Sequence, residues 1–317
     1  MSIFHLTVRS VSRASGRSAV AAAAYRAGER LLNARDGRVH DYTGKPVLEA
    51  FIMTPDTAPS WAADRSQLWN AVEATEKRKD AKVAREYELA LPAELEAPAR
   101  RSLTVKFAEL LIERYGVAVD VALHPPDAEG DQRNYHAHLL TTTRAMTPDG
   151  LGPKTRQLDV SSTASVEVEA LRASWAAIIN QALAKAHIPD RVDHRSFERQ
   201  GKSIEPTVKM GPVITAIERR ALRSDHLGTA PDAVTTRGKL NAAIKEIRGL
   251  ALYIELGRTF IRAETKKLLA TARTFAPGAK RLESLEVLQQ LAGDLGRERP
   301  RHGRLKKERT RDLNRGR

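Results

Sequence analysis

The segment Asn134-Tyr-His-Ala-His-Leu-Leu-Thr-Thr-Thr-Arg144 places two histidines one residue apart at the start of an apolar and β-branched run. We expect a strand over residues 136–143, and alternate residues of a strand lie on one face, so His136 and His138 point the same way. A second strand is expected over residues 117–124, with His124 at its end. If the two pair as an antiparallel hairpin across the polar loop 125–135, His124 lies beside His136 and three imidazoles converge.

Three neutral imidazoles form a suitable ligand set for a divalent metal such as Mn, Zn, Co or Ni, and they leave positions open for water or substrate. Asp120 shares the face of His124, so we expect it to accept a hydrogen bond from a ring N–H. The alternative is that the histidine pair arises by chance on an exposed strand and binds nothing. The absence of cysteine excludes thiolate ligands and cysteine nucleophiles.

A tyrosine and two glutamates accompany the histidines. Tyr25 lies on an alanine-rich helix expected over residues 18–32, where it either packs against the sheet or attacks a metal-polarised phosphate. Glu86 and Glu88 share one face of a strand expected over residues 86–91. They are placed to accept the tyrosine proton or to orient a metal-bound histidine, or they form the solvated face of an edge strand.

The remaining pattern predicts an α+β fold. Further strands are expected at residues 3–8 and 51–53, and helices at residues 61–77, 95–115 and 166–187. Strands in succession with helices between others favour a largely antiparallel sheet flanked by helices. No GxxxxGK[ST] or GxGxxG motif occurs, which argues against a P-loop ATPase and a dinucleotide-binding fold.

Charge indicates the class of partner. The 317 residues include 53 Lys and Arg against 39 Asp and Glu, for a formal charge of +14. A strongly basic chain favours polyanions, and with no bilayer-spanning apolar run or secretory signal we expect a cytoplasmic nucleic-acid-binding protein without membrane insertion. Because phosphodiester attack needs a bent strand in an electropositive groove, we expect backbone contacts from five cations: Arg26, Arg85, Arg144, Lys154 and Arg156.

The C-terminal third differs from the rest of the chain in amino-acid composition. Residues 231–295 are rich in Ala, Leu, Lys, Arg and Glu and predict two or three helices broken near Pro277-Gly278. Residues 297–317 hold ten Lys or Arg against three acidic residues and almost nothing apolar. Such a segment cannot bury a core, so we expect a disordered basic tail.

Five motifs in order resemble the MobA/MobL family of plasmid mobilisation relaxases (the MobQ type of HUH endonuclease). They are Ile3-Phe-His-Leu-Thr-Val-Arg, Ser18 to Arg26, Ala84-Arg-Glu-Tyr-Glu-Leu-Ala-Leu-Pro, Asn134 to Arg144, and Asp193-His-Arg-Ser-Phe-Glu-Arg-Gln-Gly. The resemblance implies a histidine-hydrophobe-histidine core with about five antiparallel strands. It also implies an enzyme that nicks one DNA strand at a plasmid transfer origin through a 5′-phosphotyrosyl intermediate and later rejoins it.

By position, the resemblance makes Tyr25 the nucleophile and His124, His136 and His138 ligands of one divalent ion, Mn²⁺ or Mg²⁺. Glu86 matches the acid that helps to activate the tyrosine, and Glu88 is a weaker second. One departure is Tyr135, which stands where the family usually has proline. Because neighbouring strand residues face opposite ways, we expect Tyr135 to point away from the metal.

The expected organisation is a nicking domain over residues 1–215, a helical segment over 216–296 and the tail over 297–317. Expected partners are single-stranded DNA at a transfer origin, accessory mobilisation proteins and a type IV secretion coupling protein. Two alternatives stay open. One is a rolling-circle replication initiator or transposase with the same core, and the other is a non-catalytic basic accessory protein.

Overall fold

The computed structural model describes residues 4–128, 131–224 and 233–275. The chain separates into two compact units, Met1–Ser196 and Phe197–Arg317. The domain boundary expected at residue 215 rests on the extent of the family motifs, which is a different criterion from the compactness of the units. It stays a prediction. Each unit is described by itself below.

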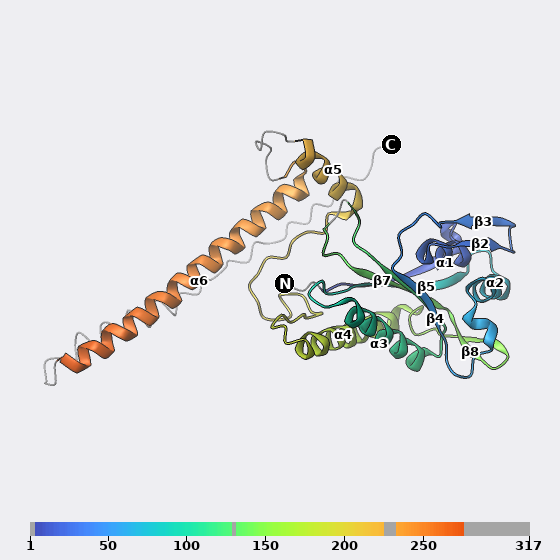
Figure 1. The fold of residues 1–317 in the computed structure, drawn as a ribbon, viewed down its shortest axis with the longest axis horizontal. Helices are drawn as coiled ribbons and strands as arrows, with labels where there is room; N and C mark the ends of the chain where they lie inside the picture. Colours follow the sequence, from blue (N-terminus) through green and yellow to red (C-terminus); the bar gives the residue numbers. More distant parts are fainter. Residues whose placement is uncertain (1–3, 129–130, 225–232, 276–317) are drawn as a thin grey trace. The chain divides into compact units, whose positions relative to one another are not determined.

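A five-stranded antiparallel sheet forms the centre of the first unit, with the order β1-β5-β7-β6-β4 (Figure 1). Its strands, in chain order, are β1 Leu6–Ser12, β4 Glu49–Met53, β5 Lys82–Ala90, β6 Val119–His124 and β7 His136–Thr142. These are the five strands expected from the sequence, with ends shifted by a few residues. The predicted α+β class is therefore confirmed.

Strand register brings the histidines together. The hairpin of β6 and β7 pairs His124 with His136 and Ala122 with His138. On its other side β7 pairs with β5, which places Glu88 opposite His138. The central strand β7 therefore has the third histidine on one neighbour and the two glutamates on the other, all on one face of the sheet.

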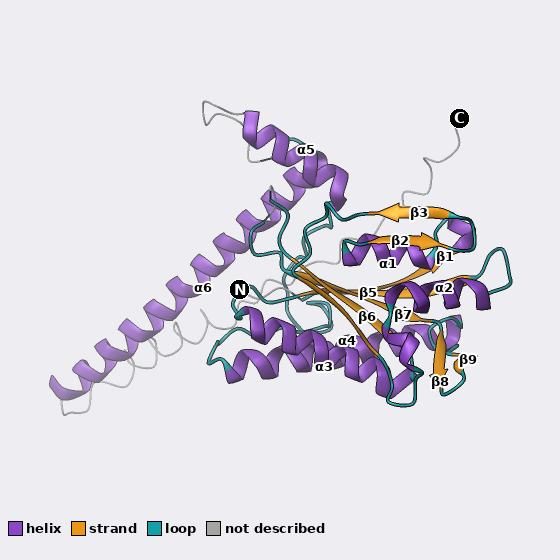
Figure 2. Ribbon diagram, turned by 45° about the vertical axis from the view of Figure 1, so that its right-hand side comes forward, coloured by secondary structure: helices purple, strands orange, loops and turns teal. Residues whose placement is uncertain are grey.

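Helices cover both faces of the sheet (Figure 2). One face packs on α3 (Ala97–Tyr115) and α4 (Ser161–Lys185) through a core in which Tyr87 and Trp175 both make edge contacts with Phe107. The opposite face packs on α1 (Ala19–Ala27) and α2 (Arg65–Thr75) through small and aromatic side chains that include Trp69. The histidines and glutamates lie on this second face of the sheet.

Helix α1 is short and is fixed at both ends. The Ser18 hydroxyl accepts from the Ala21 N–H, and the buried Glu73 carboxylate accepts from the Ala19 N–H at 2.6 Å and from Arg13. At the other end Gly28 adopts a left-handed conformation with φ of 66°. Both features are standard helix termini, so the nine-residue helix holds Tyr25 near its last turn.

The structure differs from the sequence prediction in the connections. The helix expected over residues 18–32 ends at Ala27, and Arg30–Asn33 (β2) instead pairs with Arg38–Asp41 (β3). A second small hairpin joins Arg144–Thr147 (β8) to Gly150–Lys154 (β9). The helix expected over residues 61–77 is divided into a 3-10 turn, η2 (Ser60–Ala63), and α2; a 3-10 turn, η1 (Arg13–Ser15), also follows β1.

The second unit contains α5 (Gly211–Ser224) and α6 (Thr236–Phe275). Helix α6 is continuous over 40 residues and ends before the break expected at Pro277-Gly278, so it corresponds to the first of the two or three helices expected over residues 231–295. The break predicted at Pro277-Gly278 and the basic tail over 297–317 lie outside the described residues. Within the described part of the chain, no helix has both the length and the apolar character needed to cross a bilayer.

Replacing Glu73 tests how α1 is held. Glu73→Ala leaves the Arg13 guanidinium, whose side chain is 5% exposed, without its carboxylate partner. We expect the free energy of unfolding to fall by about 3 kcal/mol, because an unpaired buried charge costs several kcal/mol. Urea unfolding followed by circular dichroism measures this, with Glu109→Ala on the exposed side of α3 as the control. An equal effect of the two substitutions would contradict the assignment.

Candidate active site

Three imidazoles converge at one end of the sheet. The ring centroids of His124, His136 and His138 lie 4.9 to 5.3 Å apart, and one nitrogen from each lies within 4.8 Å of the others. His124 is buried, and the other two are half-buried. The convergence expected from strand parity is therefore present in the fold.

Each ring also has a hydrogen-bond acceptor on its outer side. The Arg26 carbonyl is 2.7 Å from His124 Nε2, the Asn134 carbonyl is 3.0 Å from His136 Nδ1, and Glu86 Oε1 is 2.8 Å from His138 Nδ1. A carbonyl or carboxylate oxygen only accepts, so these ring nitrogens carry the protons and donate. In the neutral form of each ring, the lone pair is then on the other nitrogen: His124 Nδ1, His136 Nε2 and His138 Nε2.

Burial keeps two of the rings neutral. It lowers the pKa of His124 to about 3, with Lys45 and the two other histidines acting in the same direction, and it also lowers the pKa of His136. Metal ions bind imidazole in its neutral form. Three fixed rings with lone pairs on one side and N–H groups satisfied on the other fit a divalent ion with open positions.

Glu86 connects the histidines to α1. Its carboxylate accepts from His138 and from Arg26 Nε at 2.6 Å, and it is ion-paired with the same guanidinium. Burial opposes ionisation of Glu86, but the hydrogen bonds from His138 and Arg26 outweigh it and lower the pKa to about 2. An acid with this pKa is a weak proton acceptor, so the geometry favours Glu86 as the residue that orients His138.

The prediction that Asp120 accepts a hydrogen bond from a histidine is wrong. Asp120 lies on the predicted face, but its buried carboxylate accepts from the guanidinium of Arg65 at 2.8 Å and from Trp69 Nε1 at 2.8 Å. These donors come from α2, which covers this part of the sheet. Asp120 therefore joins α2 to β6, and Glu86 takes the place beside the imidazoles.

Tyr25 precedes a residue that contacts the histidines. That residue is Arg26, whose carbonyl accepts a hydrogen bond from His124. The Tyr25 side chain is half exposed. The ring makes an edge contact with Tyr42 at 5.1 Å, and Lys45 Nζ lies 3.6 Å from its centroid while donating to the Tyr25 carbonyl. Sequence reasoning missed Lys45 and Tyr42.

Gly28 explains how these two residues approach the tyrosine. A Cβ at this position would lie 2.9 Å from Val47 Cγ2 and 3.1 Å from the Lys45 carbonyl oxygen. The segment that follows β3 therefore packs directly against the end of α1. The Asp36-Gly37 dipeptide in the preceding hairpin is a turn signal from which the hairpin was predictable.

The five cations expected at DNA fall into different environments. Arg85 is 2% exposed and donates to Thr155 and Asp159, so its assignment to a DNA contact is wrong. Arg26 is occupied by Glu86, and Glu88 is ion-paired with Arg9 at 3.2 Å. Three cations lie together, away from the histidines, near the start of β5: Arg144, Lys154 and Arg156.

Tyr135 lies on the opposite face of the sheet from the histidines, as expected. It packs against the core beneath α3, with the Arg100 guanidinium 3.8 Å from its ring centroid. The tyrosine at the family's proline position is therefore directed away from the three imidazoles, whereas Tyr25 belongs to the helix on their side.

This five-stranded antiparallel sheet with flanking helices is an α+β fold that has a histidine-hydrophobe-histidine motif on its central strand. The model of the MobA/MobL family matches residues 17–220. The chain belongs to the MobA/MobL family, which confirms the resemblance inferred from its motifs.

Individual relatives agree with this assignment. Mobilization protein MobL of Acidithiobacillus ferridurans is 40% identical over 247 residues, covering 69% of this chain and 65% of that protein. The probable conjugal transfer protein TraA of Sinorhizobium fredii is 36% identical over 71% of this chain and 22% of its own length. The chain therefore spans less than two thirds of these curated relatives.

Among solved structures, a chain described under "Molecular Basis of Vancomycin Resistance Transfer in Staphylococcus aureus" is 29% identical. The match has a TM-score of 0.56 and covers 61% of this chain and 99% of that chain. The similarity in structure therefore extends over nearly all of that chain.

The role of Glu86 is testable by its amide. We expect Glu86→Gln to weaken Mn²⁺ binding about tenfold or more, because the neutral group holds the His138 N–H and Arg26 less firmly. Isothermal titration calorimetry measures the affinity. Glu88→Gln, on the same strand face, is the matched control and should change affinity little. An equal loss of Mn²⁺ affinity in the two variants would contradict the assignment, because both carboxylates would then act only through their negative charge.

Proposed function

We propose that this protein is a relaxase that nicks one DNA strand at a plasmid transfer origin, with Tyr25 as the nucleophile and His124, His136 and His138 as ligands of one divalent ion, Mn²⁺ or Mg²⁺. One observation carries the proposal. Three convergent imidazoles, each with its other ring nitrogen hydrogen-bonded to an acceptor, lie beside the last turn of the helix that presents a half-exposed tyrosine.

A divalent cation at the histidines would polarise a phosphoryl oxygen and stabilise the charge that grows during attack. The Tyr25 hydroxyl oxygen forms a bond to the scissile phosphorus, and the bond to the 3′ oxygen breaks. The strand then has a 5′ phosphate on the tyrosine and a free 3′ hydroxyl. Because the phosphodiester is exchanged and not hydrolysed, the reverse attack by a 3′ hydroxyl restores the strand.

Proton movement follows from the surroundings of the tyrosine. Glu86 has both of its oxygens occupied and a pKa near 2, so it holds His138 and does not take the phenol proton. Tyr25 is half exposed, which leaves water as the acceptor. Lys45, above the ring face, favours the phenolate by its positive charge.

As part of this proposal, the protein acts on DNA in the cytoplasm, together with accessory mobilisation proteins and a secretion coupling protein. A replication initiator or transposase of the same superfamily is the second candidate. In many such relatives the nucleophile follows the histidine pair in the chain, whereas Tyr25 precedes it. A non-catalytic accessory protein would have no use for three oriented imidazoles.

Adduct formation tests the nucleophile. The protein is incubated with Mn²⁺ and a labelled single-stranded oligonucleotide that spans the transfer origin, and a denaturation-resistant adduct is measured. We expect Tyr25→Phe and EDTA each to abolish the adduct, since one removes the attacking oxygen and the other the metal. Tyr135→Phe is the matched control and should retain it. An adduct that survives Tyr25→Phe, or cleavage without any adduct, contradicts the proposal.

The charge of Lys45 should make the rate of adduct formation depend on pH. Burial and the charge of Arg26 lower its pKa to about 8, against the opposing charges of Glu86 and Asp127. The cation is therefore present below pH 8 and lost above it. At pH 7 we expect Lys45→Met to slow adduct formation about tenfold, an effect consistent with the loss of a desolvated cation–π contact.

The comparison with wild type should be made across pH. The wild-type advantage over Lys45→Met should shrink above pH 8, and Lys45→Arg should retain most of the rate. The exposed Lys106 on α3 provides the control Lys106→Met. A rate ratio that stays constant from pH 6 to pH 10 would show that Lys45 acts only through packing.

A further inference from the structure

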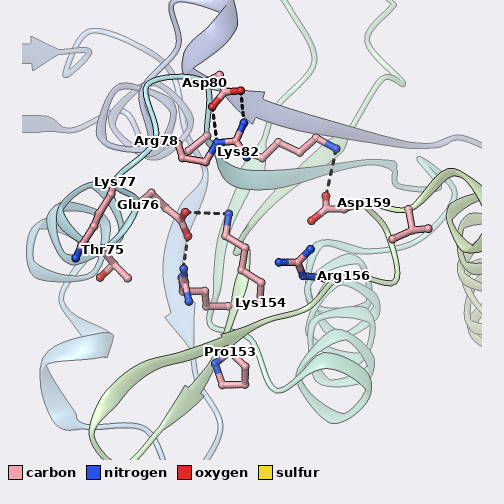
Figure 3. Close-up of a pocket in the computed structure, with 13 residues that line it drawn as sticks. Thr75, Glu76, Lys77, Arg78, Asp80, Lys82, Pro153, Lys154, Arg156 and Asp159 are labelled. Atoms are coloured by element: carbon pink, nitrogen blue, oxygen red, sulfur yellow. Dashed lines mark hydrogen bonds and ion pairs between the residues drawn. The ribbon is translucent and has the colours of Figure 1, made fainter.

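A second basic site lies at the other end of β5. A hollow of about 850 Å³ opens between the end of α2, the start of β5 and the β8–β9 hairpin (Figure 3). Its lining includes six basic and three acidic side chains. The basic ones are Lys77, Arg78, Lys82, Arg144, Lys154 and Arg156.

Part of this charge builds the walls. The Glu76 carboxylate, which is 6% exposed, accepts from Arg144 Nε at 2.8 Å and pairs with Lys154 Nζ at 2.8 Å. Asp159 pairs in the same way with Lys82 and with the buried Arg85. One carboxylate shared between two cations leaves a net positive charge in a fixed position.

Two cations remain available to a ligand. Within the described residues, the side chains of Arg156 and Lys77 have no hydrogen bond or ion pair, and both are exposed. In Figure 3 the Arg156 guanidinium extends into the hollow between Lys154 and Asp159, and no dashed line reaches it. A guanidinium held among other cations and without a carboxylate of its own is suited to bind a phosphate.

The hollow is separate from the histidine centre. His138 pairs with Glu88, and Glu88 is six steps along β5 from Lys82 at the hollow. At about 3.3 Å per strand residue, the two sites are roughly 20 Å apart. A stacked DNA strand advances about 3.4 Å per nucleotide, so this distance corresponds to about six nucleotides.

We propose that this hollow binds the phosphodiester backbone of the DNA about six nucleotides from the nicked bond, with Arg156 and Lys77 as the phosphate contacts. The proposal rests on the proposed function and adds a second DNA site to it. The dimensions favour a polyanion over a free phosphate, because cations distributed around a hollow of this volume cannot converge on one small ion. The contacts position the strand and do not read its sequence.

The test separates this site from the active site by substrate length. Two oligonucleotides are compared, one extending about three nucleotides on each side of the nick and one extending about fifteen. We expect Arg156→Ala to weaken binding of the long substrate about fivefold and to leave adduct formation from the short one unchanged. For the double variant Lys77→Ala/Arg156→Ala, the slope of log affinity against log salt should fall by about 1.4, since each single-strand phosphate contact contributes about 0.7.

Lys106→Ala removes one charge from the exposed side of α3 and should change neither the affinity nor the slope. Inorganic phosphate serves as the competing small anion. Competition by millimolar phosphate that is lost in Arg156→Ala, with unchanged affinity for long DNA, would overturn the proposal in favour of a small-anion site. An equal loss with the short and long substrates would also overturn it, because Arg156 would then belong to the active site.

Failure of the proposed function has a different result. If the wild-type protein forms no adduct with either substrate, but the salt slope for the long one still depends on Arg156 and Lys77, the hollow binds DNA and the nicking assignment fails. If adducts form normally and the slope is unchanged in the double variant, the nicking assignment stands and the second site does not exist.

Discussion

The carboxylate of Glu86 is the contact on which the site depends. It accepts the His138 ring N–H from the neighbouring strand and binds the Arg26 guanidinium from α1. The carbonyl of Arg26 in turn accepts from His124. One buried acid therefore fixes a ring on β7, and through Arg26 it fixes the end of the helix that contacts a ring on β6.

Helix α1 needs such contacts at both ends. Nine residues are too few for an isolated helix to persist in water, even with an alanine-rich sequence. Glu73 and Arg13 hold the first turn, and Glu86 and Arg26 hold the last. Burying an ion pair costs desolvation free energy, which offsets much of its contribution to the stability of the fold. The role of these two pairs is therefore to fix the position of α1. That position brings Tyr25 beside the histidines.

The alternation of side chains along the strands predicted the histidine cluster, but it did not predict which residues contact that cluster. The convergence of the three histidines follows from a period of two and one hairpin, and both are local properties of the sequence. Parity could not choose between Glu86 and Asp120 as the residue that orients a histidine, because both share the histidine face. That choice depends on Arg65 and Trp69, which a distant helix brings to Asp120. Arg85 neighbours Glu86 on the same strand, so its side chain lies on the opposite face of the sheet from the histidines. This alternation was already a sequence signal against a DNA contact of Arg85 near the histidines.

The site divides into a rigid part and an adjustable part. The imidazoles are held by strand register and by one hydrogen bond each, and groups fixed in this way keep one geometry. Tyr25 is half exposed and is held by an edge contact with Tyr42 and by Lys45, interactions of about 1 kcal/mol each. A rotamer change of the tyrosine is therefore inexpensive, while a shift of the imidazoles is not. The reaction that we propose would benefit from this division. For rejoining, the phosphate would return to the same position beside the imidazoles, whereas the tyrosine oxygen would move from solvent to phosphorus and back.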